Sequence, residues 1–249
     1  MLFLLPPSET KRTGGTGRSL SPGEQRFPEL DEIRAELRAD LTALAADGEA
    51  MMSALKLGPR LSGEVEVNRA VAESPTLPAL TRYTGVLFDE LQPDAWSPES
   101  WAYAAKHILV HSALFGLVGG TDPLPNYRLS SAARLGGASL KKRWAEACTR
   151  VLAAEARPII DLRSESYVAL GPRPGSVPTV FVRVVTPGDG GVMRALNHFN
   201  KKGKGQFIEC VIRECCPAQT PAELCAWAGE HGFRLEMASD GSGELLLVV

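Results

Sequence analysis

Ten residues, from 177 to 186 (VPTVFVRVVT), limit the possible folds of this chain more than any other segment. Seven of them are β-branched, a composition typical of a strand that packs inside a sheet. A second apolar run, Leu2–Leu5, ends at two prolines, and a third, residues 108–111, is compact enough to be a central strand. Residues 158–162 predict one more short strand. The chain is therefore expected to contain a sheet.

Helical patterns separate these predicted strands. Apolar residues recur at steps of three and four between Leu30 and Leu44, which predicts an amphipathic helix over residues 29–46 with an acidic outer face. Ser97 and Thr220 each precede a proline, an arrangement typical of the first turn of a helix. Further helices are predicted at residues 49–56, 61–72, 98–106, 139–154, 206–215 and 221–231, and after a turn at Gly85 toward residue 91.

The other segments predict turns and a closing hairpin. Residues 116–125 are rich in glycine and predict a loop, and residues 188–191 predict a turn. Residues 233–237 and 244–249, joined by Asp-Gly-Ser-Gly, predict a β-hairpin. With no internal repeat and no linker, residues 1–249 are expected to form a single mixed α/β domain, with a central mixed sheet flanked by helices.

The formal net charge of -2 says little about partners, but the charges are unevenly distributed. Residues 24–49 hold eight acids against three arginines, and residues 128–150 hold six bases against Glu146 alone. A second basic cluster lies within residues 194–213. Such asymmetry can attract a polyanion or a nucleotide, although two solvated helix faces are an equally good interpretation.

Cysteine usage and hydropathy predict a cytoplasmic protein without a membrane partner. The five cysteines are an odd number with no Cys-x-x-Cys pair, so reduced thiols are expected, with no metal site and no cofactor. The N-terminal run Leu2–Leu5 is too short for a signal peptide. No apolar run approaches the roughly 20 residues that a transmembrane helix needs.

A polar loop follows the first predicted strand. Ser8, Thr10 and Lys11 can present hydroxyl groups, backbone amides and an ammonium group to an anion. The loop lacks the Gly-x4-Gly-Lys-Ser/Thr order of a phosphate-binding P-loop. An exposed loop without a ligand is the alternative interpretation.

Two further candidates follow the strand at residues 108–111. Ser112 comes directly after it, where α/β folds usually place ligands, although a turn cap is an equally good interpretation. Asp122, in a loop bounded by proline, is placed to orient Arg128 or to accept a proton. Arg128 can bind phosphate with two hydrogen bonds beside the ring of Tyr127, but a structural Asp–Arg pair is the alternative.

The last candidate is a lysine run interspersed with glycine, namely Lys201, Lys202 and Lys204. Glycines in such a run allow backbone amides and ammonium groups to approach phosphates closely. A solvated turn is the usual alternative.

Taken in order along the chain, these segments resemble the YaaA peroxide-stress family. The matching elements, spread over nearly the whole chain, are Pro7-Ser8-Glu9-Thr10-Lys11, Tyr83-Thr84-Gly85-Val86, Ser112–Gly116, Thr121-Asp122, Tyr127-Arg128-Leu129, Trp144, Asp161–Ser164 with Tyr167, and Lys201–Gly205. Ala113 stands where the family usually has glycine, and the carboxylate of the later element is displaced to Glu165. The resemblance implies a mixed α/β domain with a positively charged cleft, DNA binding, and a role in limiting oxidative damage by peroxide.

Three functions follow from these expectations. In the first, the protein binds DNA because Lys11, Arg128 and the three lysines neutralise phosphates. In the second, it is an enzyme acting on a nucleotide or nucleobase, with Lys11 and Arg128 holding an anion, Asp122 as general base and Ser112 nearby. In the third, it is an interaction module whose polar motifs only stabilise the core. The expected partner is DNA or a phosphate-bearing small molecule.

Overall fold

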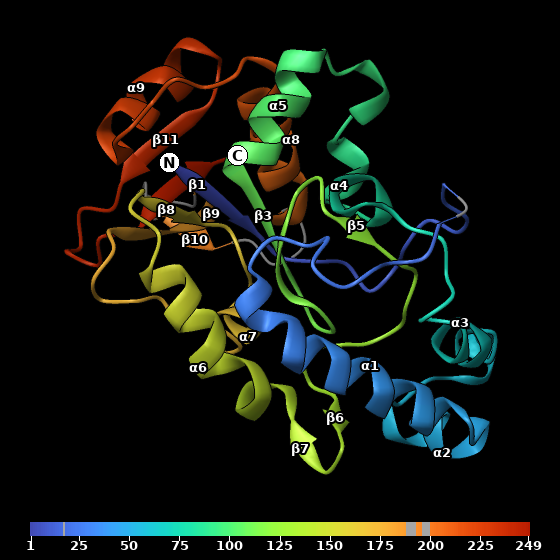
Figure 1. The fold of residues 1–249 in the computed structure, drawn as a ribbon. Helices are drawn as coiled ribbons and strands as arrows, with labels where there is room; N and C mark the ends of the chain where they lie inside the picture. Colours follow the sequence, from blue (N-terminus) through green and yellow to red (C-terminus); the bar gives the residue numbers. More distant parts are fainter. Residues whose placement is uncertain (17, 188–192, 196–199) are drawn as a thin grey trace.

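The computed structural model describes residues 1–16, 18–187, 193–195 and 200–249. Within them, an eight-stranded sheet runs through the middle of the molecule in the order β11-β12-β9-β8-β1-β3-β4, with β10 paired to β9 (Figure 1). Its strands are β1 (Leu2–Leu5), β3 (Ile108–Ser112), β4 (Gly116–Gly119), β8 (Ile159–Asp161), β9 (Thr179–Pro187), β10 (Met193–Ala195), β11 (Arg234–Met237) and β12 (Leu245–Val248).

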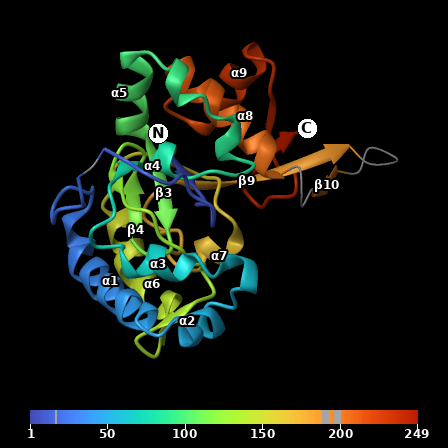
Figure 2. The same ribbon diagram turned by 90° about the vertical axis from the view of Figure 1, so that its right-hand side faces the viewer.

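The sheet is mixed. β1 pairs in parallel with β3 and β8, β8 with β9, and β9 with β12, whereas β4, β10 and β11 are antiparallel to their neighbours. The β9–β10 pair projects from the rest of the sheet (Figure 2). Two small sheets lie apart: β2 (Leu77–Pro78) with β5 (Pro123–Leu124), and β6 (Arg134–Leu135) with β7 (Ala138–Ser139).

Helices cover both faces of the sheet. α5, α8 and α9 lie on one side, and α1 and α6 lie on the other (Figure 1). The α-helices are α1 (Asp31–Ala45), α2 (Gly48–Ala54), α3 (Glu64–Arg69), α4 (Ala79–Arg82), α5 (Pro98–His107), α6 (Leu140–Ala153), α7 (Glu165–Val168), α8 (Asn200–Arg213) and α9 (Pro221–Glu230). Short 3-10 helices occupy η1 (Pro28–Leu30), η2 (Pro59–Leu61), η3 (Phe88–Glu90) and η4 (Pro93–Ala95). The mixed α/β class, with a central mixed sheet flanked by helices, is thus confirmed.

Local capping explains why several predicted helix starts are correct. The Oγ of Ser97 accepts a hydrogen bond from the Ser100 amide at 3.2 Å, and Oγ1 of Thr220 accepts one from the Glu223 amide at 3.2 Å. Ser139 does the same for the basic helix α6. These bonds satisfy amides that lack an intrahelical partner, so each cap determines where its helix begins.

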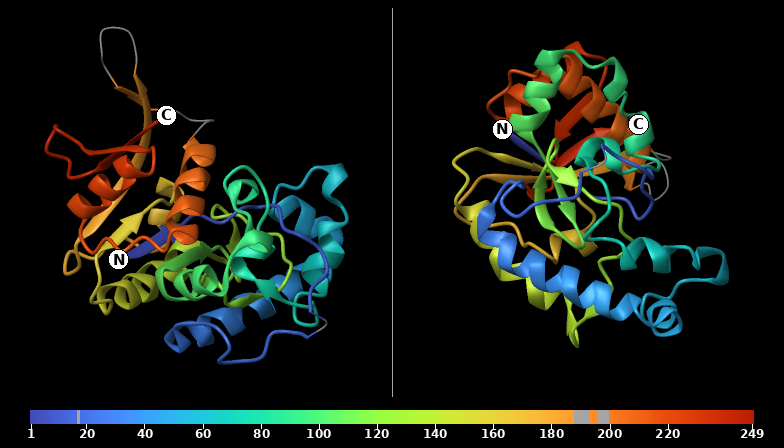
Figure 3. Two further views of the ribbon diagram at one scale, coloured as in Figure 1. Left: turned by 90° about the horizontal axis from the view of Figure 1, so that it is seen from above. Right: turned by 45° about the vertical axis from the view of Figure 1, so that its right-hand side comes forward.

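Some predicted helices are shorter than expected. The segment predicted at 61–72 contains α3 and only the last residue of η2, and residues 79–91 contain α4 and η3 on either side of Gly85. α2 and α3 pack against one end of α1 (Figure 3). The predicted turn at 188–191 lies outside the described residues, whereas the predicted hairpin near the C-terminus is confirmed as β11 and β12.

The prediction of a loop over residues 116–125 is wrong. Residues Gly116–Gly119 form β4, which pairs with β3 and is completely buried. Gly116 has a φ of 64°, and a Cβ there would lie 2.8 Å from the ring of Trp144. Gly116 leaves room for the ring of Trp144 and adopts the positive φ of a tight turn. The glycines that suggested a loop therefore belong to a buried hairpin.

The predicted start of a helix at residue 206 is also wrong, because this helix begins earlier and includes the lysine run. The lysines at positions 201, 202 and 204 lie on α8, which begins at Asn200 rather than near residue 206. A Cβ at Gly203 would lie 2.8 Å from Val249, and one at Gly205 would lie 2.4 Å from the carbonyl oxygen of Leu87. The glycines therefore allow close packing of the helix and do not free the backbone for phosphate.

The topology determines where polar loops meet. β1 and β8 are neighbours, and the chain leaving β1 runs to β3 on one side, whereas the chain leaving β8 runs to β9 on the other. Ligands of open α/β sheets usually bind where connections diverge, outside the carboxyl ends of the strands. Residues that follow β1 and β8 are therefore brought together at one edge.

No helix among the described residues combines the length and the apolar character that crossing a bilayer requires.

Candidate functional site

A cleft of about 810 Å³ opens at the carboxyl ends of β1 and β8. Five segments that lie far apart in the sequence supply its walls, within residues 6–10, 128–131, 162–167, 181–184 and 200–204. The volume is in the range of about 300–1,000 Å³ that small-molecule sites occupy. This cleft is the candidate functional site.

The side chains of the cleft include five bases and two acids. The bases are Arg128, Arg163, Arg183, Lys201 and Lys204, and the acids are Glu9 and Glu165.

Protein carboxylates already pair with three of these bases. Arg128 forms an ion pair with Glu9, and Arg183 binds both carboxylate oxygens of Glu244 at 2.6 and 2.8 Å. Arg163 is completely buried and is paired with Asp161 at 2.8 Å. Within the described chain, no carboxylate lies within 4.0 Å of the ammonium group of either cleft lysine.

The loop after β1 brings two of the predicted hydroxyl groups to the cleft. Ser8 and Thr10 both line it, and their side-chain oxygens lie 3.2 Å apart. Gly85, with a φ of 98°, packs against this loop, and a Cβ there would lie 3.0 Å from the Ser8 Oγ. The segment around Gly85 therefore has the role of supporting the loop.

Lys11 supports the same loop from behind and is not in the cleft wall. Its Nζ donates to the carbonyl oxygens of Ser8 and Glu9, at 3.2 and 3.3 Å. The ammonium also lies 3.9 Å from the centre of the Tyr127 ring. Burial, and then repulsion from Arg128, lower the pKa of Lys11 to about 7. The lysine thus connects the loop to the core.

Ser112 and Tyr127 lie beneath this lysine in a buried chain of hydroxyl groups. The Oγ of Ser112 is 2.7 Å from the Tyr127 hydroxyl, which is 2.8 Å from the Tyr83 hydroxyl. Burial raises the pKa values of both tyrosines. The structure therefore places Ser112 and Tyr127 under the loop, outside the cleft wall.

Asp122 is not near the cleft. Its Oδ2 accepts hydrogen bonds from the backbone amides of Gly119, at 2.8 Å, and Arg26, at 2.7 Å. It makes no ion pair with Arg128, whose carboxylate partner is Glu9. The carboxylate connects the turn after β4 to the chain before α1, which is a structural role.

The three predicted lysines of α8 face different ways. Lys201 is exposed at the cleft, Lys204 is 4% exposed and lines the same cleft, and Lys202 does not line it. The Nζ of Lys202 lies 4.0 Å from the carboxylate of Glu90. Helical geometry separates these residues because positions three apart share a face and adjacent positions do not.

Among the cleft residues that were not predicted as site residues are Arg163, Tyr167, Phe181 and Arg183. Two of them had a signal in the sequence. Arg163 follows a predicted strand, in the position where ligand-binding residues are common. Arg183 is the single charge in the β-branched run. Nothing local to Tyr167 or Phe181 indicated that their rings would face a cleft.

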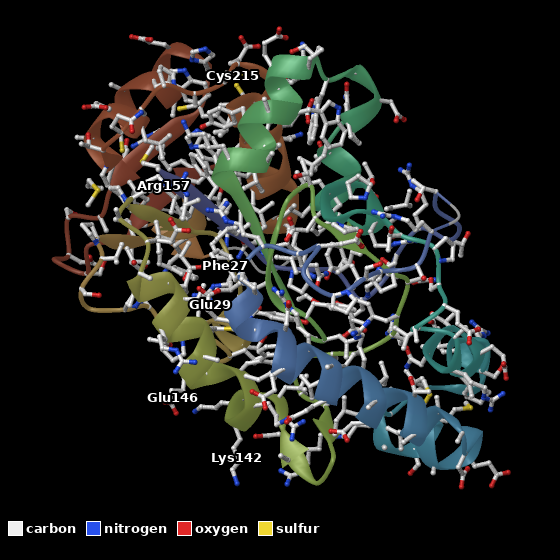
Figure 4. The ribbon with its side chains drawn as sticks, in the orientation of Figure 1. Phe27, Glu29, Lys142, Glu146, Arg157 and Cys215 are labelled. Carbon is white, nitrogen blue, oxygen red and sulfur yellow. The ribbon has the colours of Figure 1, made fainter. Side chains whose placement is uncertain are left out.

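The charge asymmetry along the chain is partly compensated within the fold. Arg143 of the basic helix α6 binds Glu36 and Asp40 of the acidic helix α1, at 2.9 and 3.3 Å. Lys142 and Glu146 point away from the molecule on the outer side of α6 (Figure 4). The interpretation as solvated helix faces therefore applies to much of this cluster.

Neither metal nor thiol chemistry finds support in the described part of the chain. No three His, Cys, Asp or Glu side chains gather there in a way that could hold a metal ion. All five cysteines are free thiols, and burial raises the pKa of each, to about 12 for Cys148. Since the thiolate is the reactive form, these positions are disfavoured as nucleophiles.

Comparison with known proteins connects this fold and cleft to one family. The sequence model of the peroxide stress protein YaaA family matches residues 1–238. A UPF0246 protein of Corynebacterium efficiens is 39% identical over 254 residues, covering 100% of both chains, and one of Corynebacterium glutamicum is 37% identical over the same span. A UPF0246 protein of Streptomyces coelicolor is 34% identical over 249 residues, covering 98% of this chain and 95% of its own. The chain therefore belongs to the YaaA peroxide stress protein family.

Proposed function

We propose that this protein acts in the cytoplasm in the response to peroxide and binds DNA through the positively charged cleft. The observation that carries the proposal is the pair of cleft lysines, Lys201 and Lys204, which have no carboxylate within 4.0 Å in the described chain. Phosphate contacts of this kind position DNA without reading its sequence. The cytoplasmic location rests on the five free cysteines, since disulfides dominate in oxidising compartments.

The direct test is a titration of duplex and single-stranded DNA over a salt series. Each phosphate contact should contribute about −0.9 to the slope of log affinity against log salt for a duplex, and about −0.7 for a single strand. Lys201→Ala removes an exposed cleft cation. It should make this slope less steep by the contribution of about one phosphate contact.

Lys142→Ala is the matched control because Lys142 is an exposed lysine on α6 that points away from the molecule. It should leave the slope unchanged. Loss of binding in this control, with retention in Lys201→Ala, would place DNA on another face. Absence of binding at the lowest salt concentration would remove the proposal.

An enzyme acting on a nucleotide or nucleobase is a second candidate for the same cleft. The volume of about 810 Å³ favours it, because small-molecule sites have volumes in this range. The expected general base, Asp122, lies elsewhere, which leaves Glu9 and Glu165 as the carboxylates of the cleft. Hydrolysis of a nucleoside or nucleotide, lost on Glu165→Gln with the fold intact, would support this candidate.

A further inference from the structure

Lys204 is a buried residue in the wall of the cleft. It is 4% exposed and lines the cleft, whereas Lys201, one turn earlier on the same face of α8, is exposed at the cleft mouth. The Lys204 Nζ donates one hydrogen bond, to the carbonyl oxygen of Leu162 at 2.9 Å, and lies 5.3 Å from the centre of the Phe181 ring. An ammonium has three protons to donate, so this group keeps unused donor capacity within the described surroundings.

The groups around Lys204 do not neutralise its charge. Asp161 is the acid that interacts with it most, but both oxygens of that carboxylate bind Arg163, at 2.9 and 2.8 Å. Arg163 also donates to Nδ1 of His111 at 2.8 Å, and burial keeps the pKa of that histidine well below its usual value, so it carries no charge. Arg183 is balanced by Glu244. The buried floor therefore holds one excess positive charge.

An ammonium buried without a counterion is costly. Removing such a charge from water carries a free-energy penalty that a fold normally offsets with a carboxylate. Here burial lowers the pKa of Lys204 to about 8, with Asp161 opposing this change and Arg183 adding to it. A bound anion would supply the missing negative charge and satisfy the remaining protons.

The depth of Lys204 limits the kind of anion that can reach it. A phosphate inside a DNA strand carries a substituent on both sides, so it must stay where both flanking nucleotides have room. A terminal phosphate is attached through one oxygen only and can approach a buried ammonium group from a single side. We propose that the floor of the cleft binds a terminal phosphate monoester against Lys204, either of a mononucleotide or of a phosphorylated strand end. This inference rests on the proposed function and narrows it to strand ends and nucleotides.

The test compares single-stranded oligonucleotides of one sequence with a free hydroxyl, a 5′-phosphate or a 3′-phosphate at the end. One of the two phosphates should tighten binding to the wild-type protein at least about tenfold at low salt, near pH 7. Lys204→Met, which fills the same buried space without charge, should abolish that gain, so that the phosphorylated and hydroxyl oligonucleotides bind this variant equally. Lys202→Met, on the same helix but outside the cleft, should keep the gain.

A labelling experiment needs no variant and so does not depend on Lys204→Met folding. Pyridoxal 5′-phosphate carries both a phosphate and an aldehyde, and its aldehyde forms an imine with a neutral lysine amine, with loss of water. Borohydride then reduces the imine to a stable amine that mass spectrometry can locate. Lys204 should be labelled, and adenosine monophosphate should protect it whereas adenosine should not.

The outcomes separate this inference from the proposed function. If the oligonucleotides bind but neither phosphate strengthens binding, or the gain survives in a folded Lys204→Met, the inference is wrong and DNA binding stands. If no oligonucleotide binds, DNA binding is wrong. In that case protection of Lys204 by adenosine monophosphate, but not by adenosine, still supports the phosphate site, and equal labelling with and without the nucleotide overturns it.

Discussion

Two lysines, one half-buried and one buried, show how single residues obtain unusual properties in this fold. Lys11 and Lys204 lie in different segments, and burial is the largest cause of the lowered pKa of each. Their surroundings differ: Lys11 lies against a tyrosine ring and two carbonyl oxygens, whereas Lys204 lies in the wall of the cleft. The first therefore supports the loop of Ser8 and Thr10, and the second is available to a ligand.

The stability contribution of Lys11 should depend on pH. Its pKa is lower in the folded state, about 7 against 10.5, so the unfolded chain binds more protons between these values. The free energy of unfolding should consequently rise as the pH increases from about 7 to about 9. Lys11→Met lacks this rise. The free energy of unfolding of the wild type should therefore increase relative to that of the variant over this pH range.

Urea denaturation at about pH 6, 7.5 and 9 measures this difference for Lys11. Other groups titrate equally in both proteins, so their effects cancel in the comparison. A difference that stays constant over the three pH values would show that Lys11 has an ordinary pKa.

At the scale of an element, α8 shows how packing overrides local preference. Its first turns contain Gly203 and Gly205, which are unfavourable in a helix by about 1 kcal/mol each relative to alanine. The glycines are retained where η3 and the C-terminal residue Val249 approach the helix closely. The element thus carries Lys201 and Lys204 to the cleft at the expense of helix propensity.

Replacing glycine by alanine should therefore have opposite effects on the free energy of unfolding in α8 and α9. Gly205→Ala places a methyl group 2.4 Å from the Leu87 carbonyl oxygen, and we expect a loss of about 1–3 kcal/mol in the free energy of unfolding. Gly229→Ala in α9 meets nothing within 4 Å, and we expect a gain of up to about 1 kcal/mol. Chemical denaturation of both variants measures the two signs, and a gain for Gly205→Ala would contradict the packing described here.

At the scale of the whole molecule, distant segments are connected by a few polar contacts. Asp122 connects the backbone of Arg26 to the turn after β4 through two amide hydrogen bonds. Arg82, completely buried, donates to four backbone carbonyl groups, those of Arg12, Gly14, Pro75 and Leu124. These contacts hold the loop regions around the sheet in place.

Asp122→Ala should weaken the fold without affecting the cleft. Two buried or half-buried amides lose a charged acceptor, which predicts a loss of about 2–3 kcal/mol in the free energy of unfolding. DNA binding by the folded fraction should equal that of the wild type. A stable variant that has lost a catalytic activity would instead restore Asp122 as the general base of an enzyme.

Much of the framework could be predicted because its signals are local. The β-branched run, the caps at Ser97 and Thr220, and the apolar period before Leu44 each depend on neighbours within a few residues, and the structure has the expected elements there. The glycine-rich segments around Gly116 and Gly205 were misread because local composition does not distinguish a loop from a close contact.

The candidate site was predictable only in part, since it depends on contacts across the chain. Local patterns were enough to predict β1, β3, β8, β9, β11 and β12, most helices, and the segments that carry hydroxyl and basic side chains. They could not show that Ser8, Arg128, Lys201 and Lys204 share one cleft, that Lys11 and Tyr127 support it from beneath, or that Asp122 lies elsewhere. Side chains distant in sequence meet because of the order of the strands, and strand order follows from packing of the whole chain.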